Sequence, residues 1–476
     1  MKQAGKTILF ILTVILPFII IGSITFCIPK QYSNTFLAGL SVKYHRLKSI
    51  DQPKIVVIGG SNVAFGLDSL TMEKYTGFSV VNFGLYATLG TKAMLDLSKS
   101  SVNKGDIIVI SPETDAQTMS LYYNGESMWQ ALDGDYGMLW DVGFDNFGPL
   151  LGAFFSYSND KLNFYLDKSM PDPKGVYKKT SFNKLGDIIY ERPYNSMLLH
   201  YDPTHQIMLD PSIVQDDFIE YLNRYAKYVR NKGAKIYFSF PPMNRLALEK
   251  GSTEASIYSF YEYLRDKLDF EIISDINDYI LDKDYFYDTN FHLNDTGVRV
   301  RTSMLAGDIL RYEGNASSVE LDLPPAPIRP ANYFETVEED DTSGYFIYKD
   351  VEGGGITLTD ISDLGKSQTE LKIPSSYEGK PILSIEPAAF SKCTKLKRVI
   401  IGKNTNLKQL YNGVFAGCTS LEIIEIHVLP NALNVGFDLF KGASDTCKVY
   451  VHKDMYGDFA TDYIWIRLMD RVEILK

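Results

Sequence analysis

Apolar runs and amphipathic segments alternate along residues 53–312 of the chain. The first apolar run, residues 55–58, consists of four β-branched side chains and ends at a pair of glycines, Gly59 and Gly60. Such uninterrupted runs are typical of strands in a parallel sheet, because helices cover both faces of that sheet. The next residue, Ser61, is therefore expected at the carboxyl edge of the sheet, where open α/β folds bind their ligands.

Further runs of the same kind predict strands and helices in alternation. The strands are expected at residues 80–84, 106–111, 234–240 and 270–273, and the helices at residues 92–101, 216–232, 252–268 and 298–311. This order predicts an α/β fold with a parallel sheet and helices on both faces. Residues 115–211 break the rhythm and are rich in Tyr, Gly, Asp and Pro. We expect them to form an insertion above the carboxyl edge of the sheet.

The pattern changes again after residue 312. Residues 313–343 are rich in proline and then in acidic side chains, which predicts an extended linker. Within residues 344–476, Phe390, Phe415 and Phe440 recur at intervals of 25 residues. A fixed period of this length predicts a solenoid, in which each unit buries its apolar side only against its neighbours.

Residues 7–28 are almost entirely apolar, and Lys2 and Lys6 precede them. A run of this length predicts a transmembrane helix, so residues 1–30 are expected to be a cytoplasmic tip and anchor, and residues 31–52 a membrane-proximal stretch. The bulk of the chain is then expected outside the cytoplasm. The alternative is a cleavable signal peptide, but the run is long for one and no small-x-small cleavage site follows it.

The four cysteines form neither a C-x-x-C pair nor a zinc-type spacing. Cys393 and Cys418 occupy the same position in two repeats, which predicts stacked buried thiols rather than a disulfide. Neither H-E-x-x-H nor a P-loop occurs, so no metal and no cofactor are predicted. The chain has 48 basic and 59 acidic residues and a net charge of -11, which argues against nucleic acid as a partner.

A nucleophilic serine needs a base, usually a histidine that a carboxylate orients. Of the six histidines, only His292 follows the last predicted strand of the α/β region, at the same edge of the sheet as Ser61. Asp288 lies four residues before it, in a loop that precedes a helix. The other histidines lie in the membrane-proximal stretch, the insertion and the repeats: His45, His200, His205, His427 and His452.

These residues resemble the motifs of the SGNH (GDSL-like) hydrolase superfamily. The motifs are Ser61 in Gly-Gly-Ser-Asn, Gly84 in Asn-Phe-Gly, and Asp288 with His292 before the last helix. The similarity is greatest to the membrane-anchored, extracytoplasmic branch, with proteins similar to the D-alanine transfer protein and to polysaccharide O-acetyl transferases and esterases. It implies a flavodoxin-like, three-layer α/β/α domain. It also implies Ser61 as nucleophile, His292 as base, Asp288 as its orienter, and the backbone N–H groups of Ser61 and Gly84 as oxyanion donors.

Two features depart from the superfamily pattern. The spacing from Asp288 to His292 is four residues instead of three. The third block, residues 111–115, lacks the asparagine that completes the oxyanion hole. Loss of one such donor costs about 2.7 to 4 kcal/mol of transition-state stabilisation. Either Asn62 or Asn244 is expected to replace it, or activity is weak, or the site only binds.

The repeats resemble the BspA-type leucine-rich repeats of bacterial surface proteins, through Ala389-Phe390, Cys393, Leu396 and their copies 25 residues on. The resemblance implies contact with a protein or host-surface partner, or else a passive stalk. For the whole chain, the resemblance to the SGNH superfamily implies a membrane-anchored, extracytoplasmic serine esterase or O-acetyl transferase that acts on an acylated polysaccharide or a teichoic-acid-like polymer. The alternative is a catalytically inactive glycan-binding or adhesion protein.

Overall fold

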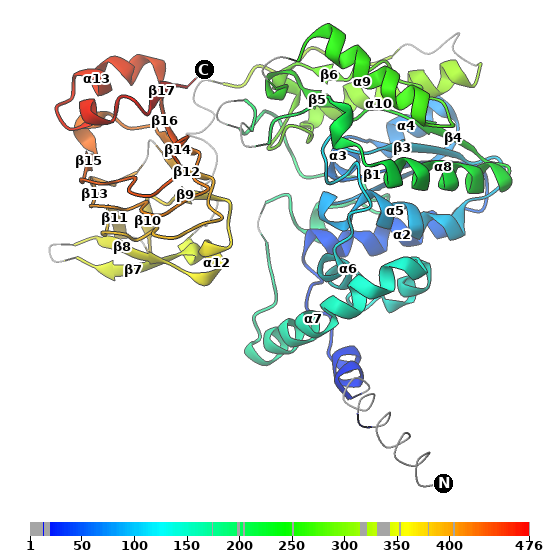
Figure 1. The fold of residues 1–476 in the computed structure, drawn as a ribbon. Coiled ribbons are helices and arrows are strands. Elements are labelled where there is room, and N and C mark those ends of the chain that lie inside the picture. The colour runs from blue at the N-terminus through cyan, green and yellow to red at the C-terminus, as the bar shows by residue number, and fades with distance from the viewer. Residues whose placement is uncertain are drawn as a thin grey trace. The chain divides into compact units, whose positions relative to one another are not determined.

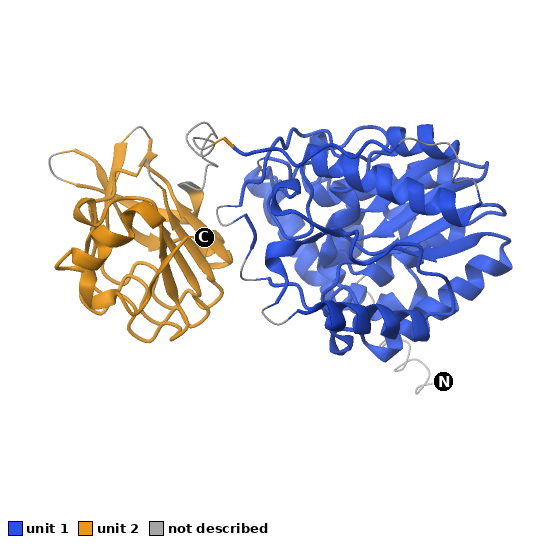
Figure 2. Cartoon of the chain, turned by 90° about the horizontal axis from the view of Figure 1, so that it is seen from above, with its two compact units in different colours: residues 1–329 blue, residues 330–476 orange. Residues whose placement is uncertain are grey.

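The computed structural model describes most of the chain in eleven stretches. They are residues 13, 20–173, 175–197, 200–202, 205–249, 252–314, 321–330, 343–351, 354–378, 380–402 and 405–475. The chain divides into two compact units, Met1–Arg329 and Pro330–Lys476, which are coloured separately in Figure 2.

Unit 1 is built on a parallel sheet with the strand order β2-β1-β3-β4. The strands are β1 (Lys54–Gly59), β2 (Ser79–Gly84), β3 (Ile107–Ser111) and β4 (Lys235–Phe238). Gly59 pairs with Gly84 on one side and with Ser111 on the other, so three strands end at the same level. The strand predicted at 270–273 is reduced to one parallel bridge between Phe238 and Ile272.

Helices cover both faces of this sheet (Figure 1). They are α2 (Gly39–Ser49), α4 (Ser69–Thr76), α5 (Thr91–Ser98), α8 (Asp216–Asn231), α9 (Glu254–Lys267) and α10 (Asp295–Tyr312). Ile55 and Val57 belong to one core cluster with residues of α4 and α10, including Leu305. Val56 and Ile58 belong to the other, with residues of α2, α5 and α8. Burial on both faces explains why residues 55–58 of β1 are all apolar.

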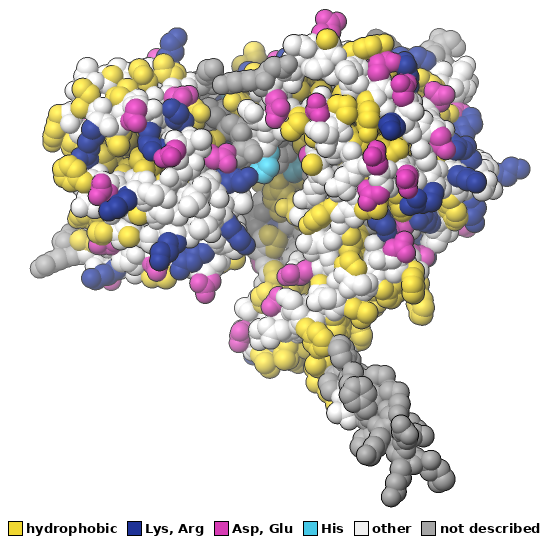
Figure 3. Space-filling model, in the orientation of Figure 1, with side chains coloured by type: hydrophobic (Ala, Val, Ile, Leu, Met, Phe, Trp, Pro, Cys, Tyr) yellow, Lys and Arg dark blue, Asp and Glu magenta, His cyan; other side chains and the backbone are white. Residues whose placement is uncertain are grey.

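The insertion contains helices that its composition did not predict, α6 (Gly125–Leu132) and α7 (Phe147–Asp167). Apolar side chains gather on the surface of α7 and the turns before it (Figure 3). They are Trp140, Phe144, Phe147, Leu151 and Phe155, of which Trp140 is 91% exposed. Phe147, Leu151 and Phe155 follow one another at four-residue intervals and therefore share one face of α7, and the Phe144 ring lies 5.9 Å from that of Phe147.

The prediction of an N-terminal transmembrane helix, and of a single-pass membrane location, is wrong on the evidence of the described residues. Among these, no helix combines the length and the apolar character that crossing a membrane requires. Residues 1–12 and 14–19 of the predicted segment lie outside the described residues. The described end of the segment packs on the insertion, because the Phe26 ring lies 4.7 Å from that of Tyr136 and 5.9 Å from that of Phe154. A hydropathy pattern alone does not separate such packing from contact with lipid.

Unit 2 is a solenoid with two parallel sheets. One has the order β17-β16-β14-β12-β9, and the other has the order β15-β13-β11-β8 with β7 antiparallel at its edge and β10 paired to β11. The strands are β7 (Phe346–Asp350), β8 (Ile356–Ile361), β9 (Glu370–Ile373), β10 (Ser376–Tyr377), β11 (Lys380–Ile385), β12 (Arg398–Ile401), β13 (Gln409–Leu410), β14 (Ile423–Ile426), β15 (Asn434–Val435), β16 (Lys448–Val451) and β17 (Val472–Ile474).

The predicted period of 25 residues is confirmed by the register of this solenoid. Arg398 pairs with Ile423, and Ile423 pairs with Lys448. The repeated phenylalanines stack in the core, with 5.3 Å between the rings of Phe390 and Phe415. Each turn therefore covers the apolar side of the turn before it.

The cysteines of unit 2 are buried and carry no disulfide, in agreement with the predicted stack of thiols. The Cys418 Sγ donates a hydrogen bond of 2.9 Å to the carbonyl oxygen of Phe390, one repeat earlier. Burial raises the pKa of the Cys418 thiol to about 12. These thiols are thus packing groups rather than reactive ones.

Candidate active site

Ser61 is the first residue of α3 (Ser61–Ala64), the short helical turn that follows β1. This turn packs so closely on the sheet that only glycine fits at two strand ends. A Cβ at Gly59 would lie 2.4 Å from the Ser111 carbonyl oxygen, and a Cβ at Gly84 would lie 2.4 Å from Cβ of Val63. The neighbouring strands therefore fix the position of Ser61, which is 5% exposed.

The Gly84→Ala substitution is expected to lower the free energy of unfolding by about 1 to 3 kcal/mol, because the added methyl group overlaps Val63. It should also displace Ser61, because the turn must shift. Gly152→Ala is the matched control, since Gly152 lies in α7 with no neighbour within 4 Å of an added Cβ. Urea unfolding measures both variants, and a Gly84→Ala protein as stable as Gly152→Ala would contradict the close packing.

Ser61 is hydrogen-bonded to a buried carboxylate rather than to a histidine. Its Oγ donates to Glu113 Oε1 over 2.7 Å, and the N–H of Asn62 donates to the same oxygen over 2.9 Å. Burial is the main cause that raises the pKa of Glu113, and the nearby Asp115 adds to it, whereas the charge of His292 lowers it. An asparagine was expected in residues 111–115, and Glu113 was missed. The signal that could have identified it was a carboxylate two residues after the end of a strand.

His292 and Asp288 lie together as predicted from their shared loop. Asp288 Oδ1 lies 2.7 Å from His292 Nδ1, so Nδ1 carries the hydrogen and a neutral ring offers Nε2 as acceptor. Tyr177 donates its hydroxyl hydrogen to Asp288 Oδ2 over 2.7 Å. A backbone hydrogen bond of 2.8 Å from the N–H of Tyr287 to the carbonyl of His292 closes the loop. The spacing of four residues between Asp288 and His292 therefore still allows the hydrogen bond between their side chains.

An aromatic wall holds the His292 ring. The ring lies flat on Phe65, with 3.9 Å between the centroids and an angle of 3° between the planes. Tyr177 and Tyr86 continue this wall, with their rings 6.5 Å apart. His292 itself is 3% exposed, whereas Tyr86 is 36% exposed. The wall fixes the orientation of the imidazole and gives the site one accessible aromatic face.

The Ser61–Glu113 and Asp288–His292 pairs meet at Phe65, whose N–H donates to the Ser61 carbonyl over 2.8 Å and whose ring stacks on His292. Among the described residues, no hydrogen bond joins Ser61 to His292. The charge of His292 is near enough to lower the pKa of Glu113. Burial, followed by the charges of Asp288 and Glu113, raises the pKa of Tyr86. The Tyr86 hydroxyl is thus within electrostatic range of both carboxylates.

The side-chain amides considered for the oxyanion hole are already engaged. Asn62 donates from Nδ2 to the Ser111 carbonyl over 2.9 Å and accepts the Gly60 N–H at Oδ1 over 3.2 Å. Asn244 lies in β5 (Met243–Asn244), which pairs with β6 (Ile280–Leu281), and its Nδ2 donates to the His200 carbonyl over 2.8 Å. Both amides therefore stabilise the local backbone.

Gly84, the other predicted donor, lies at the end of β2 next to Gly59. Its N–H donates to Asn82 Oδ1 over 3.4 Å, which is longer than the usual range of about 2.7 to 3.2 Å.

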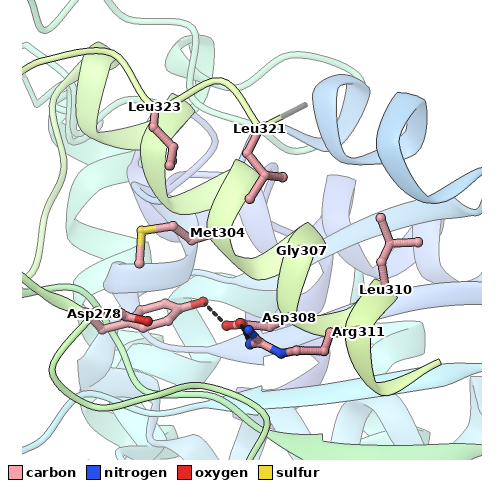
Figure 4. A pocket seen from close by; sticks show the side chains of 9 residues that line it. Asp278, Met304, Gly307, Asp308, Leu310, Arg311, Leu321 and Leu323 are labelled. Atoms are coloured by element: carbon pink, nitrogen blue, oxygen red, sulfur yellow. Dashed lines mark hydrogen bonds and ion pairs between the residues drawn. The ribbon is translucent and has the colours of Figure 1, made fainter. Parts of the chain in front are cut away.

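A cavity of about 470 Å³ lies elsewhere in unit 1, against α10 (Figure 4). Its lining includes Tyr279, Asp308 and Leu321. The Tyr279 hydroxyl donates to Asp308 Oδ2 over 2.9 Å, and burial raises the pKa of Asp308 to about 6. Neither Ser61 nor His292 lines this cavity.

No family model matches the chain, and no curated protein matches it. Two solved structures of leucine-rich repeat proteins are similar to a quarter of the chain. The T. pallidum leucine-rich repeat protein is 22% identical over 25% of this chain and 66% of its own, with a TM-score of 0.18. The Bacteroides ovatus protein is 20% identical over 25% of this chain and 38% of its own, with a TM-score of 0.17.

The chain spans 66% and 38% of the lengths of these two proteins. The description of unit 2 as a repeat solenoid rests on its own strand register.

Proposed function

We propose that unit 1 is a serine-dependent esterase or acyl transferase, similar to SGNH hydrolases, that acts on O-acyl groups of a glycan. The observation that carries the proposal is the placement of Ser61 at the carboxyl edge of the sheet, within hydrogen-bond distance of a proton acceptor, Glu113. The pair of His292 and Asp288 lies in the same site. Nucleophile, proton acceptors and an orienting carboxylate are the groups that acyl transfer requires.

In the proposed reaction, Ser61 Oγ attacks the acyl carbonyl and loses its proton. The glycan oxygen leaves with a proton, and the acyl group stays on Ser61 as an ester. Water or a second sugar hydroxyl then attacks this ester, gives up a proton and releases Ser61. The His292 imidazole, oriented by Asp288, transfers protons in these steps, and the N–H groups of Ser61 and Gly84 are the proposed oxyanion donors.

A glycan substrate is proposed because the accessible wall of the site is aromatic. Tyr86 exposes 36% of its surface next to the buried ring of Phe36 and the partly buried ring of Tyr177. An amphipathic ring of this kind offers an apolar face to a sugar and a hydroxyl to its polar groups. The proposed substrate is an acylated polysaccharide or a teichoic-acid-like polymer. Unit 2, with its BspA-type repeats, is the proposed contact for a protein or surface partner.

The proposal is tested by labelling the full chain with a fluorophosphonate probe and by measuring acetate release from an acetylated oligosaccharide. Wild type should take up the probe, and Ser61→Ala should lose both labelling and acetate release. Ser49→Ala is the control, since Ser49 is exposed and donates only to the Arg46 carbonyl within its own helix. Equal labelling of wild type and Ser61→Ala would refute the proposal.

A second candidate is a catalytically inactive glycan-binding protein. It is favoured by the hydrogen bond of Ser61 to Glu113 instead of His292, and by the engagement of the Asn62 and Asn244 amides. This candidate predicts that wild type and Ser61→Ala bind the acetylated oligosaccharide equally in calorimetry and that neither releases acetate. Acetate release by wild type alone would exclude it.

A further inference from the structure

We infer that Glu113 is a catalytic residue: it accepts the proton of Ser61, whereas His292 exchanges protons with the leaving and incoming hydroxyl groups. The inference rests on the proposed function, because it assigns two proton acceptors of one acyl-transfer site to two different steps. Glu113 touches the reacting atom directly, since its Oε1 lies 2.7 Å from Ser61 Oγ.

The position of Glu113 is that of a general base. A base must lie within about 2.6 to 3.2 Å of the atom whose proton it takes, and the Glu113 carboxylate does. The N–H of Asn62 binds the same Oε1 over 2.9 Å and fixes this geometry. The turn allows the approach because residue 60 is glycine, where an added Cβ would lie 3.1 Å from Oε1.

The groups that face Glu113 make it a better base than an exposed carboxylate. Burial and the charge of Asp115 raise its pKa, and the charge of His292, from the opposite loop, lowers it. Tyr86, from the loop after β2, is close enough to respond to the Glu113 charge. A carboxylate whose pKa is raised toward the working pH takes a proton more readily.

The protons balance over two steps. In the first, Ser61 Oγ bonds to the acyl carbon as its proton moves to Glu113, and the glycan oxygen leaves with a proton from the His292 imidazolium. In the second, the incoming hydroxyl gives its proton to the neutral His292 and bonds to the acyl carbon. Ser61 Oγ then leaves and recovers its proton from Glu113. Both residues end in their starting states.

This assignment of the proton transfers to Glu113 and His292 also explains how a carboxylate and an oxyanion can occupy the same site. An ionised Glu113 would repel negative charge on the carbonyl oxygen. Because Glu113 takes the Ser61 proton in the step in which that charge forms, its own charge disappears as the oxyanion appears. The transition state therefore carries no second, permanent negative charge beside the oxyanion.

The test compares Glu113→Gln with wild type in the full chain, by kcat/KM for an acetylated oligosaccharide as a function of pH. The amide oxygen of Gln still accepts both hydrogen bonds but takes no proton. We expect kcat/KM to fall at least about 100-fold and the acid limb of the profile to disappear, with the thermal midpoint unchanged. Asp115→Asn, which removes a charge that raises the Glu113 pKa, should move the acid limb to lower pH.

Activity of Glu113→Gln within about threefold of wild type, or an unchanged acid limb, would overturn the inference. If Glu113→Gln does not fold, Glu113→Asp replaces it, and an acid limb at the wild-type pH would overturn the inference equally. Failure of the two proposals is distinguishable. A fully active Ser61→Ala refutes the proposed function, whereas an inactive Ser61→Ala beside an active Glu113→Gln refutes only the role of Glu113.

Discussion

The Asp288→Asn substitution is expected to lower kcat/KM about 10⁴-fold without unfolding the protein. Asp288 accepts the Nδ1 hydrogen of His292 over 2.7 Å and thereby leaves Nε2 for the proposed proton exchange with the substrate. An amide at this position presents N–H groups to Nδ1, which favours the opposite tautomer. It also removes the negative charge that stabilises the imidazolium. The measurement is kcat/KM for ester hydrolysis, with circular dichroism as the check of folding.

The Tyr177→Phe substitution removes a hydrogen bond that positions Asp288 but leaves the charge of Asp288 unchanged. The hydroxyl of Tyr177 donates to Asp288 Oδ2, and its ring packs on Phe36 and Phe65. The phenylalanine ring keeps this packing, and the carboxylate keeps its bond to His292, so a loss of no more than about tenfold is expected, in line with about 1 kcal/mol for one hydrogen bond. Equal losses in Asp288→Asn and Tyr177→Phe would show that the tautomer of His292 does not matter.

Local patterns in the sequence predicted the parts of the fold that depend on near neighbours. The run at residues 55–58 predicted β1, and the pair of glycines predicted the turn that bears Ser61. The 25-residue interval from Phe390 to Phe415 predicted the solenoid, since each turn contacts the next one along the chain. In each case the contacts that stabilise the element are repeated or close in sequence.

The proposed role of Glu113 depends on a contact between residues that are 52 positions apart. Its side chain reaches Ser61 only because β3 pairs with β1 and both strands end at the same level. For Asn62 the opposite holds, because the sequence suggested a role for it that its contact does not support. Its amide was a candidate oxyanion donor, but it binds the Ser111 carbonyl at the end of β3. The pairing of β3 with β1 therefore determines what the side chains of Glu113 and Asn62 contact.

Helix α7 was missed for a local reason. Gly148, Pro149 and Gly152 lie in its first half, and glycine and proline lower the helix propensity of any window that contains them. Pro149 lies in the first turn, where its missing N–H costs no hydrogen bond. The apolar stripe that includes Leu151 and Phe155 was the helical signal in this segment.

The Arg398→Met substitution is expected to destabilise unit 2 by about 3 to 5 kcal/mol. Arg398 Nε donates to Glu425 Oε1 over 2.7 Å, and both side chains are buried, at 7% and 0% exposure. Without Arg398, the Glu425 carboxylate stays buried, with the ring nitrogen Nε2 of His427 at 3.6 Å from its Oε2. Another partner of Arg398, Glu370, is half exposed.

Hydrogen exchange of the β12 and β14 amides in the full chain measures this loss in unit 2 alone. The expected destabilisation corresponds to exchange that is about 200- to 5,000-fold faster. The double variant Arg398→Met, Glu425→Leu should regain most of the protection, because an apolar pair of similar volume replaces a buried ion pair at little cost. Equally fast exchange in the single and double variants would show that the loss comes from the packing of the Arg398 stem and not from the charge left on Glu425. The difference in protection between the single and the double variant therefore measures the penalty of the unpaired carboxylate.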